Sequence, residues 1–302
     1  MGVVLNVLLP GRDKLATVAP FATWLARGST LPAAAPGYLA ALAEYFRWPG
    51  GPLPAAALIR QSVAGDAGAA WWLSADPAWV QPELSGARLL ACGNLGLTAE
   101  ESTALVAALT ETFEAEGMRL QMGDAQHWQL RLPADVDVPS FPEPEDALGA
   151  DLFEQLPKGD AGRRWRALIN EAQVVLHNHP VNQARASRGL PPVNSVWLWG
   201  PGVLPDWVEC GLSRIYSDDL LAWSLGHKAD VDVQARSVFA GSDASPYTLL
   251  DLQDVQADDF ARSWWPAIRA RLENGAELRL AFADGTRTVL HKHHRLRFWR
   301  KP

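Results

Sequence analysis

The run VVLNVLL, residues Val3 to Leu9, decides the class of fold expected for this 302-residue chain. It is apolar and rich in β-branched residues, and Pro10 and Gly11 end it. A short apolar run bounded by turn residues is typical of a buried β-strand rather than of a helix. We therefore expect this segment to open a sheet.

Helix and strand patterns alternate along the rest of the chain. The residues from Thr98 to Glu101 match a capping box and predict a helix that stops at Gly117. A second long helix is expected after Asp160, and a third is expected to kink or restart at Pro266. The expected strands include SVWLWG (195–200) and YTLLDL (247–252).

The segment ELRLAFADGTRTVLHKH (277–293) predicts a C-terminal β-hairpin with a type I′ turn at Asp284 and Gly285. Strands that alternate with helices are typical of α/β proteins. We therefore predict an α/β fold with a mainly parallel central sheet flanked by helices, ending in this hairpin.

Residues 133–160 are rich in proline and acidic residues, which is typical of a linker or a surface loop. This segment predicts a division into an N-terminal α/β part, residues 1–132, and a C-terminal α/β part, residues 161–302. A single domain is the alternative.

Composition excludes several classes of partner. A net charge of −7 argues against a nucleic-acid surface, which needs a basic stripe to neutralise phosphates. No apolar run is long enough to span a bilayer, and the N-terminus lacks the basic segment of a signal peptide, so we expect no membrane partner and no export. Cys92 and Cys210 are far apart and outside any zinc spacing, which indicates a reducing compartment, the cytoplasm.

The stretch HNHPVNQARASRGLPPVNSVWLWGPG, from His177 to Gly202, gathers polar residues that core packing does not explain. His179, Asn182 and Arg185 are spaced by three, so a helical turn starting at Pro180 would bring them together. Arg185 offers forked donors for a carboxylate or a phosphate, and amide side chains can orient such an anion. A site for a small anionic metabolite is therefore one hypothesis.

The remaining residues of this stretch are expected to shape the motif. Gly189 supplies a left-handed helix stop, and the proline pair after it holds the chain extended before a strand whose two tryptophans share a face. The proposed ligand contacts are His179, Asn182, Arg185 and Asn194, and the shaping residues are Pro180, Gly189, Pro191, Pro192, Trp197 and Trp199. The alternative is structural: the asparagines bind buried backbone groups at a helix-to-strand corner, and Arg185 binds nearby carbonyls.

With SADP (74–77) and LINE (168–171), this stretch resembles the RpfE-type regulatory proteins and, more distantly, archaeal-type cofactor-independent phosphoglycerate mutases. The resemblance implies an alkaline-phosphatase-like fold. It also implies that His179, Asn182, Arg185 and Asn194 match a substrate-handling pattern, HP-x-N-x-x-R-x-x-x-G-x-x-x-N.

The sequence departs from that superfamily where paired metal ions would be held. Asp13 is the only acid near the end of the first strand, the segment YTLLDLQDVQADDF has no histidine, and Asp284 is followed by Gly285 instead of histidine. We therefore predict a degenerate member with no metal, no cofactor and no catalytic residues, a regulatory protein that binds a phosphorylated or carboxylated metabolite. The alternatives are an active metal-dependent phosphoglycerate mutase or phosphotransferase, and a scaffold that binds no ligand.

His291, His293 and His294 form the other candidate metal group, if the hairpin strand continues through them. The interleaved Lys292 and Arg295 would repel a cation, so a solvated basic edge strand explains the run equally well.

Overall fold

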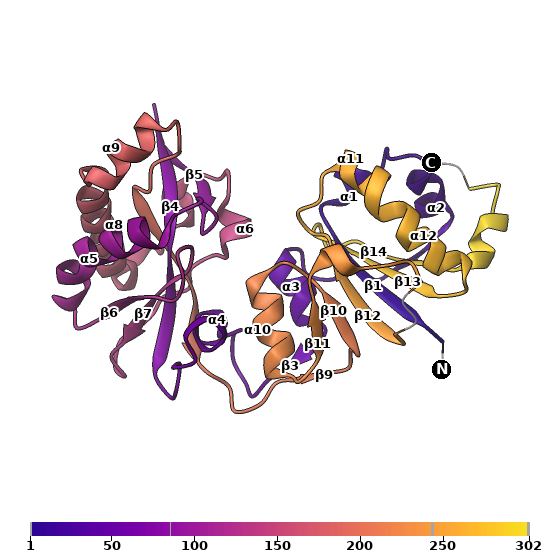
Figure 1. The fold of residues 1–302 in the computed structure, drawn as a ribbon, viewed down its shortest axis with the longest axis horizontal. Coiled ribbons are helices and arrows are strands. Elements are labelled where there is room, and N and C mark those ends of the chain that lie inside the picture. The colour runs from indigo at the N-terminus through magenta and orange to yellow at the C-terminus, as the bar shows by residue number, and fades with distance from the viewer. Residues whose placement is uncertain (1, 85, 243–244, 301–302) are drawn as a thin grey trace. The chain divides into compact units, whose positions relative to one another are not determined.

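The structure is a computed structural model, and it describes residues 2–84, 86–242 and 245–300. The chain divides into two compact units (Figure 1). Unit 1 consists of Met1–Pro49 together with Trp207–Pro302, and unit 2 is the continuous segment Gly50–Asp206. Unit 2 is thus an insertion in unit 1. The division predicted at residues 133–160 lies inside unit 2, because this turn-rich segment buries apolar residues such as Phe141, Leu152 and Leu156 within that unit.

Unit 1 contains a seven-stranded sheet in the order β11-β10-β12-β1-β13-β14-β2. Its strands are β1 (Val4–Leu9), β2 (Ser29–Leu31), β10 (Arg214–Tyr216), β11 (Asp232–Gln234), β12 (Tyr247–Asp251), β13 (Glu277–Phe282) and β14 (Arg287–Leu290). β1 pairs in parallel with both β12 and β13, and β10 pairs in parallel with β11 and β12. The predicted opening strand is therefore the buried centre of a mainly parallel sheet.

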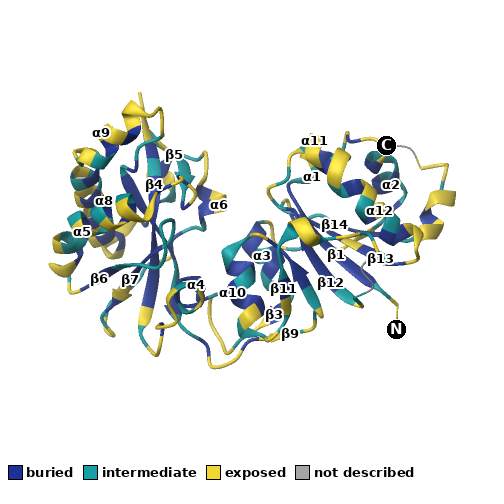
Figure 2. Ribbon diagram, in the orientation of Figure 1, coloured by how far each residue is buried: buried dark blue, intermediate teal, exposed yellow. Residues whose placement is uncertain are grey.

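Successive side chains of β1 point to opposite faces of the sheet and so belong to two different layers of unit 1. Leu5, Val7 and Leu9 join a core with apolar residues of α2 (Phe21–Arg27) and α12 (Trp265–Glu273). The opposite face carries polar residues as well, because Asn6 is buried there and donates to the carbonyl of Thr248 at 3.2 Å. Figure 2 shows the strands buried and the outer sides of the helices exposed.

The helices of unit 1 are α1 (Arg12–Leu15), α2, α3 (Tyr38–Ala43), α10 (Leu220–Lys228), α11 (Ala257–Asp259) and α12, with 3-10 turns at Arg236–Val238 and Lys292–Leu296. A π-helical segment, Phe260–Trp264, precedes α12 and Pro266. This confirms the predicted restart at that proline, which lacks the N–H needed to continue the α-helical pattern. A two-stranded sheet joins β3 (Phe46–Arg47) to β9 (Glu209–Cys210).

β13 pairs antiparallel with β14, but the turn between them is not type I′. That turn requires positive φ at both central residues, whereas Gly285 has φ +86° and Asp284 is outside the left-handed region. Four residues separate the strands, and Gly285 N–H donates to the Phe282 carbonyl at 2.9 Å. The Asp284 carboxylate accepts from the Thr286 N–H at 2.8 Å and so stabilises this wider loop.

Unit 2 is built on an antiparallel sheet, so the predicted parallel arrangement applies to unit 1 alone. Its strands are β4 (Trp71–Glu83), β5 (Gly86–Cys92), β6 (Arg119–Met122), β7 (Trp128–Leu132) and β8 (Ser195–Val203). β4 is the organising strand, because β5 and β7 pair along one edge and β8 pairs along the other. The strand predicted at residues 195–200 is confirmed and buried, but among the described residues it pairs on one side only.

The helices of unit 2 are α4 (Ala55–Ala64), α5 (Ala99–Glu114), α6 (Pro144–Ala147), α7 (Leu152–Gln155), α8 (Gly159–His177) and α9 (Pro180–Ser187). Figure 1 shows α5, α8 and α9 together on one side of β4. The capping box at Thr98 and Glu101 is confirmed, with both hydrogen bonds present. α8 begins at Gly159 with Lys158 as its N-cap, so Asp160 lies in its first turn and does not cap it. None of the helices in the described part of the chain could cross a bilayer.

Candidate functional site

The quoted motif forms a corner between α8, α9 and β8. α9 starts at Pro180, as predicted, and His179 is its N-cap, whose Nδ1 accepts from the Val181 N–H at 3.2 Å. Gly189 has φ +70° and follows the end of this helix, which confirms the predicted left-handed stop. The side chain of His179 therefore caps the N-terminus of α9 in this structure.

Asn182 joins the two sides of the corner. Its Nδ2 donates to the carbonyls of Leu176 and Val193 at 2.7 and 2.8 Å, and its Oδ1 accepts from the Val193 N–H at 2.8 Å. The residue is buried. Three hydrogen bonds to backbone groups use both amide atoms, which is the arrangement that the structural alternative describes.

Arg185 is fully buried and is likewise bound by protein groups. Its Nε donates to the Pro191 carbonyl at 2.9 Å, and Nη2 donates to the Leu95 carbonyl at 2.7 Å. Its Nη1 donates to Glu101 Oε2 at 2.9 Å. Each guanidinium nitrogen thus already has a protein acceptor.

Glu101 is the carboxylate that anchors this corner. It accepts from the Thr98 N–H in the capping box, from Arg185, and from the half-exposed Arg188. Burial by itself raises the pKa of Glu101, but the Thr98 N–H and the two guanidinium groups lower it below its usual value. The sequence shows the capping box but not that the same carboxylate also binds two arginines.

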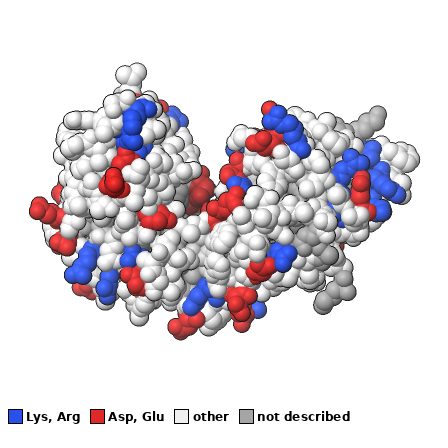
Figure 3. Space-filling view, in the orientation of Figure 1, with Lys and Arg blue, Asp and Glu red and all other residues white. Residues whose placement is uncertain are grey.

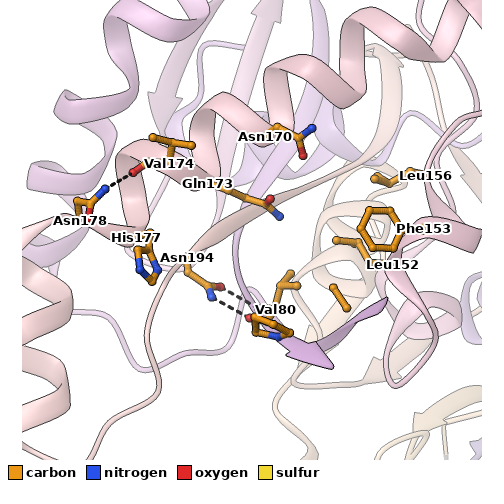
Figure 4. A pocket seen from close by; sticks show the side chains of 12 residues that line it. Val80, Leu152, Phe153, Leu156, Asn170, Gln173, Val174, His177, Asn178 and Asn194 are labelled. Carbon is orange, nitrogen blue, oxygen red and sulfur yellow. Dashed lines mark hydrogen bonds between the residues drawn. The ribbon is translucent and has the colours of Figure 1, made fainter. Parts of the chain in front are cut away.

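Asn194 extends the sheet with its side chain. Its Oδ1 accepts from the Val80 N–H at 2.8 Å and its Nδ2 donates to the Val80 carbonyl at 2.7 Å, as the dashed lines in Figure 4 show. The amide therefore imitates one more residue of a paired strand. Asn194, one of the four predicted ligand contacts, also lines a pocket.

Trp199 of β8 binds a buried carboxylate that sequence reasoning missed. Trp199 Nε1 donates to Asp76 Oδ2 at 2.7 Å, and the Trp128 N–H donates to Asp76 Oδ1 at 3.2 Å. Trp197 Nε1 donates instead to the Pro142 carbonyl at 3.1 Å. Burial raises the pKa of Asp76 to about 6. An acidic residue inside the apolar run WWLSADPAWV was the available signal.

A pocket of about 440 Å³ opens beside Asn194 (Figure 4). Its apolar lining comes from β4, β5, α7 and α8: Val80, Pro82, Ala87, Leu152, Phe153, Leu156 and Val174. Its polar lining is Asn170, Gln173, His177, Asn178 and Asn194. Two residues of the quoted motif, His177 and Asn178, thus join Asn194 here although neither was a predicted contact.

The carboxylates at the carboxyl edge of the unit 1 sheet form separate groups. Asp251, at the end of β12, accepts from the hydroxyls of Tyr38 and Ser217 at 2.8 and 2.7 Å. Burial, and after it nearby Asp219, raises the pKa of Asp251, the two hydroxyls act in the opposite direction, and the resulting pKa is about 6. This buried cluster is the second site that sequence reasoning missed.

Asp284 and Asp254 bind other partners. Asp284 accepts from the Arg12 N–H at 3.0 Å and from Thr286, and Asp254 forms an ion pair with Arg236. Asp13 is exposed on α1. Within residues 2–84, 86–242 and 245–300, no three His, Cys, Asp or Glu side chains gather as a metal site would require.

His293 and His294 lie in a 3-10 helix and His291 is its N-cap, so the three are not on a strand face. The ring centroids of His291, His293 and His294 are 4.6 to 5.2 Å apart. His294 is buried, and its Nδ1 accepts from the His291 N–H at 3.4 Å. Figure 3 shows that acidic and basic side chains both occur on the visible face of each unit.

No protein-family model matches this chain. Among curated proteins, it is 45% identical over 62 residues to a probable 2,3-bisphosphoglycerate-independent phosphoglycerate mutase of Geobacter sulfurreducens, a match that covers 20% of this chain and 16% of that protein. It is 32% identical over 109 residues to the corresponding mutase of Methanothrix thermoacetophila, covering 36% and 27% of the two chains. For the mutase of Methanosarcina mazei the identity is 30% over 113 residues, covering 36% and 28%.

Two solved structures are similar over most of this chain. The PH0037 protein of Pyrococcus horikoshii has a TM-score of 0.45 at 12% identity, with 96% of this chain and 87% of that chain covered. The cofactor-independent phosphoglycerate mutase of Thermoplasma acidophilum has a TM-score of 0.37 at 14% identity, with 96% and 89% covered.

The sequence matches span between 16% and 28% of the curated mutases named above. Over up to 36% of its length, this chain is similar to 2,3-bisphosphoglycerate-independent phosphoglycerate mutases.

Proposed function

We propose that this protein is a phosphoglycerate-mutase-like binding protein that lacks mutase activity and serves in regulation, as the RpfE-type resemblance implies. The proposal rests on the hydrogen bonds and ion pairs that the carboxylates at the carboxyl edge of the unit 1 sheet already make with protein groups. Asp251 is held by two hydroxyls, Asp284 by backbone N–H groups and Thr286, and Asp254 by Arg236.

Metal-assisted phosphoryl transfer needs ligands that converge on the cations and leave room for the phosphate. In this chain a cation at Asp251 Oδ2 would compete with the Tyr38 and Ser217 hydroxyls, on a carboxylate that burial already favours in its protonated form. A cation at Asp254 would compete with a guanidinium group. These partners support a binding role over metal-dependent mutase chemistry.

An enzyme assay tests this proposal. Purified protein is incubated with 3-phosphoglycerate and manganese, cobalt or zinc, and the formation of 2-phosphoglycerate is followed. An active cofactor-independent mutase assayed in parallel is the positive control. We expect no turnover above background. Turnover that a chelator abolishes would instead establish the active metal-dependent enzyme.

For the His177–Gly202 motif itself, a structural role is the second candidate. The observation that favours it is the set of contacts made by Asn182 and Arg185, whose polar atoms bind neighbouring protein groups. The motif then builds part of the wall of the pocket beside Asn194. Direct binding of a phosphorylated or carboxylated metabolite by Arg185 stays a prediction, and thermal unfolding with 3-phosphoglycerate tests it.

A further inference from the structure

The lining of the pocket beside Asn194 has no carboxylate, ammonium or guanidinium group. Among the described residues that line it, none is Asp, Glu, Lys or Arg. An anion that left water for this pocket would find no lysine or arginine to pair with, only the imidazole of His177, and burying a poorly paired charge is costly. The pocket is therefore poorly suited to phosphoglycerates.

Several polar groups in the lining already have protein partners. Both amide atoms of Asn194 bind Val80, and Asn178 Nδ2 donates to the Val174 carbonyl at 3.1 Å. Gln173 Nε2 donates to Ser195 Oγ at 3.2 Å. An apolar ligand can therefore cover these groups without leaving them unsatisfied.

The strand edge beside the pocket is closed to an added peptide strand. Val80 has its N–H and its carbonyl bound by Asn194. Pro82 lies two residues further along β4, so its backbone faces the same edge, and proline has no N–H to donate. An extended peptide could not continue a ladder here, so an occupant must be held by contacts with side chains.

We propose that this pocket binds a neutral, predominantly apolar small molecule, packed against Leu152, Leu156 and Val80. Its volume of about 440 Å³ lies within the range of about 300 to 1,000 Å³ typical of small-molecule sites. The inference rests on the proposed function in one respect, that unit 2 binds the ligand. It differs in the charge of that ligand, which is neutral here instead of anionic.

Two fluorescent probes that differ by one charge test this inference. N-phenyl-1-naphthylamine is neutral, and 1-anilinonaphthalene-8-sulfonate has the same aromatic skeleton with a sulfonate added. We expect saturable binding of the neutral probe, with the sulfonate at least about tenfold weaker because no lysine or arginine lines the pocket. An excess of 3-phosphoglycerate should not displace the neutral probe.

A matched pair of variants locates the binding site. Val174 lines the pocket and is 66% exposed, and Val238 in unit 1 is 57% exposed, so glutamate at either position can remain in water when the protein is folded. We expect Val174→Glu to weaken binding of the neutral probe by about tenfold, because its carboxylate stands at the pocket wall. Val238→Glu should leave the affinity unchanged, and the melting temperatures of both variants verify folding.

The inference is overturned if the neutral probe does not saturate, if the sulfonate binds as tightly, or if both glutamate variants lose affinity equally. The mutase assay fails or succeeds independently of these results. Turnover in that assay together with neutral-probe binding at Val174 would refute the proposed function and leave this inference standing.

Discussion

Arg185 Nη1 lies 2.9 Å from Glu101 Oε2 and joins the last turn of α9 to the first turn of α5. Because Glu101 also closes the capping box of α5, one carboxylate orders a helix start and anchors the corner of the motif. The two residues are 84 positions apart in the chain. Their contact is therefore a tertiary link within unit 2.

Replacing Arg185 with methionine distinguishes a structural arginine from a ligand contact. Arg185→Met keeps the aliphatic stem and helix propensity but leaves the Leu95 and Pro191 carbonyls and Glu101 without this donor. We expect the free energy of unfolding to fall by about 3 kcal/mol, with or without 3-phosphoglycerate. Chemical denaturation measures the change.

Arg188→Met is the matched control, because Arg188 pairs with the same carboxylate but is 48% exposed. It should lower stability by less than about 1 kcal/mol. Unchanged stability in Arg185→Met, with loss of a 3-phosphoglycerate-induced rise in melting temperature, would show that Arg185 binds the anion.

Asn194→Ala removes the side chain that extends the sheet at Val80. Because the Val80 N–H and carbonyl lose their partner, we expect unfolding to become easier by about 1 to 3 kcal/mol. Asn170→Ala, at an exposed position of the same pocket, is the comparison variant. Equal stability losses in the two variants would contradict a special role for Asn194.

The pH dependence of stability should carry a signature of Asp251. Its pKa of about 6 in the folded protein exceeds the value of about 3.9 for an unfolded chain, so the folded protein binds this proton more tightly. The contribution of this group to stability is therefore full below about pH 4 and is lost as the pH rises through about 6, a change of about 3 kcal/mol.

Asp251→Asn cannot ionise, and the Tyr38 and Ser217 hydroxyls can either donate to or accept from an amide. We expect the difference in unfolding free energy between the parent protein and this variant to decline from pH 4 to pH 7. Asp13→Asn is the matched exposed variant. A difference that does not vary with pH would refute the raised pKa.

Alanine substitutions at two glycines with left-handed backbones distinguish the cost of backbone strain from the cost of a steric clash. A Cβ at Gly189, φ +70°, would meet nothing within 4 Å, whereas one at Gly200, φ +61°, would lie 2.7 Å from the Cβ of Ala55. We expect Gly189→Ala to cost about 1 to 2 kcal/mol and Gly200→Ala to cost more. Urea denaturation of both variants checks this order, and the reverse order would contradict the packing of α4 on β8.

Local signals predicted the elements that depend on nearby residues. The capping box at Thr98, the apolar run of β1 and the glycine stop at Gly189 all act over a few positions, and the structure confirms each of them. The buried stripe of α8, from Trp165 to Leu176, follows directly from helical periodicity.

Features that depend on residues far apart in the chain could not be predicted from local sequence signals. Spacing indicates that Asn182 and Arg185 share a helix face, but it does not show that the acceptors of Arg185 include Glu101 and Leu95, 84 and 90 residues away. The pocket was missed for a related reason: α7 lies in a proline-rich segment that composition assigned to a linker or a surface loop. The prediction of a type I′ turn was wrong because the number of loop residues, rather than the Asp-Gly pair alone, sets the turn type.

The insertion of unit 2 has a consequence for the order in which the protein acquires its structure during synthesis. Asn6 of β1 must find Thr248, 242 residues later in the chain, so the central strand of unit 1 leaves the ribosome long before its partners β12 and β13. Unit 2 is continuous and can fold as soon as Asp206 has emerged. The apolar β1 must therefore stay unpaired while unit 2 forms, and the ribosome-bound chain at that stage should be a substrate for chaperones that bind exposed apolar strands.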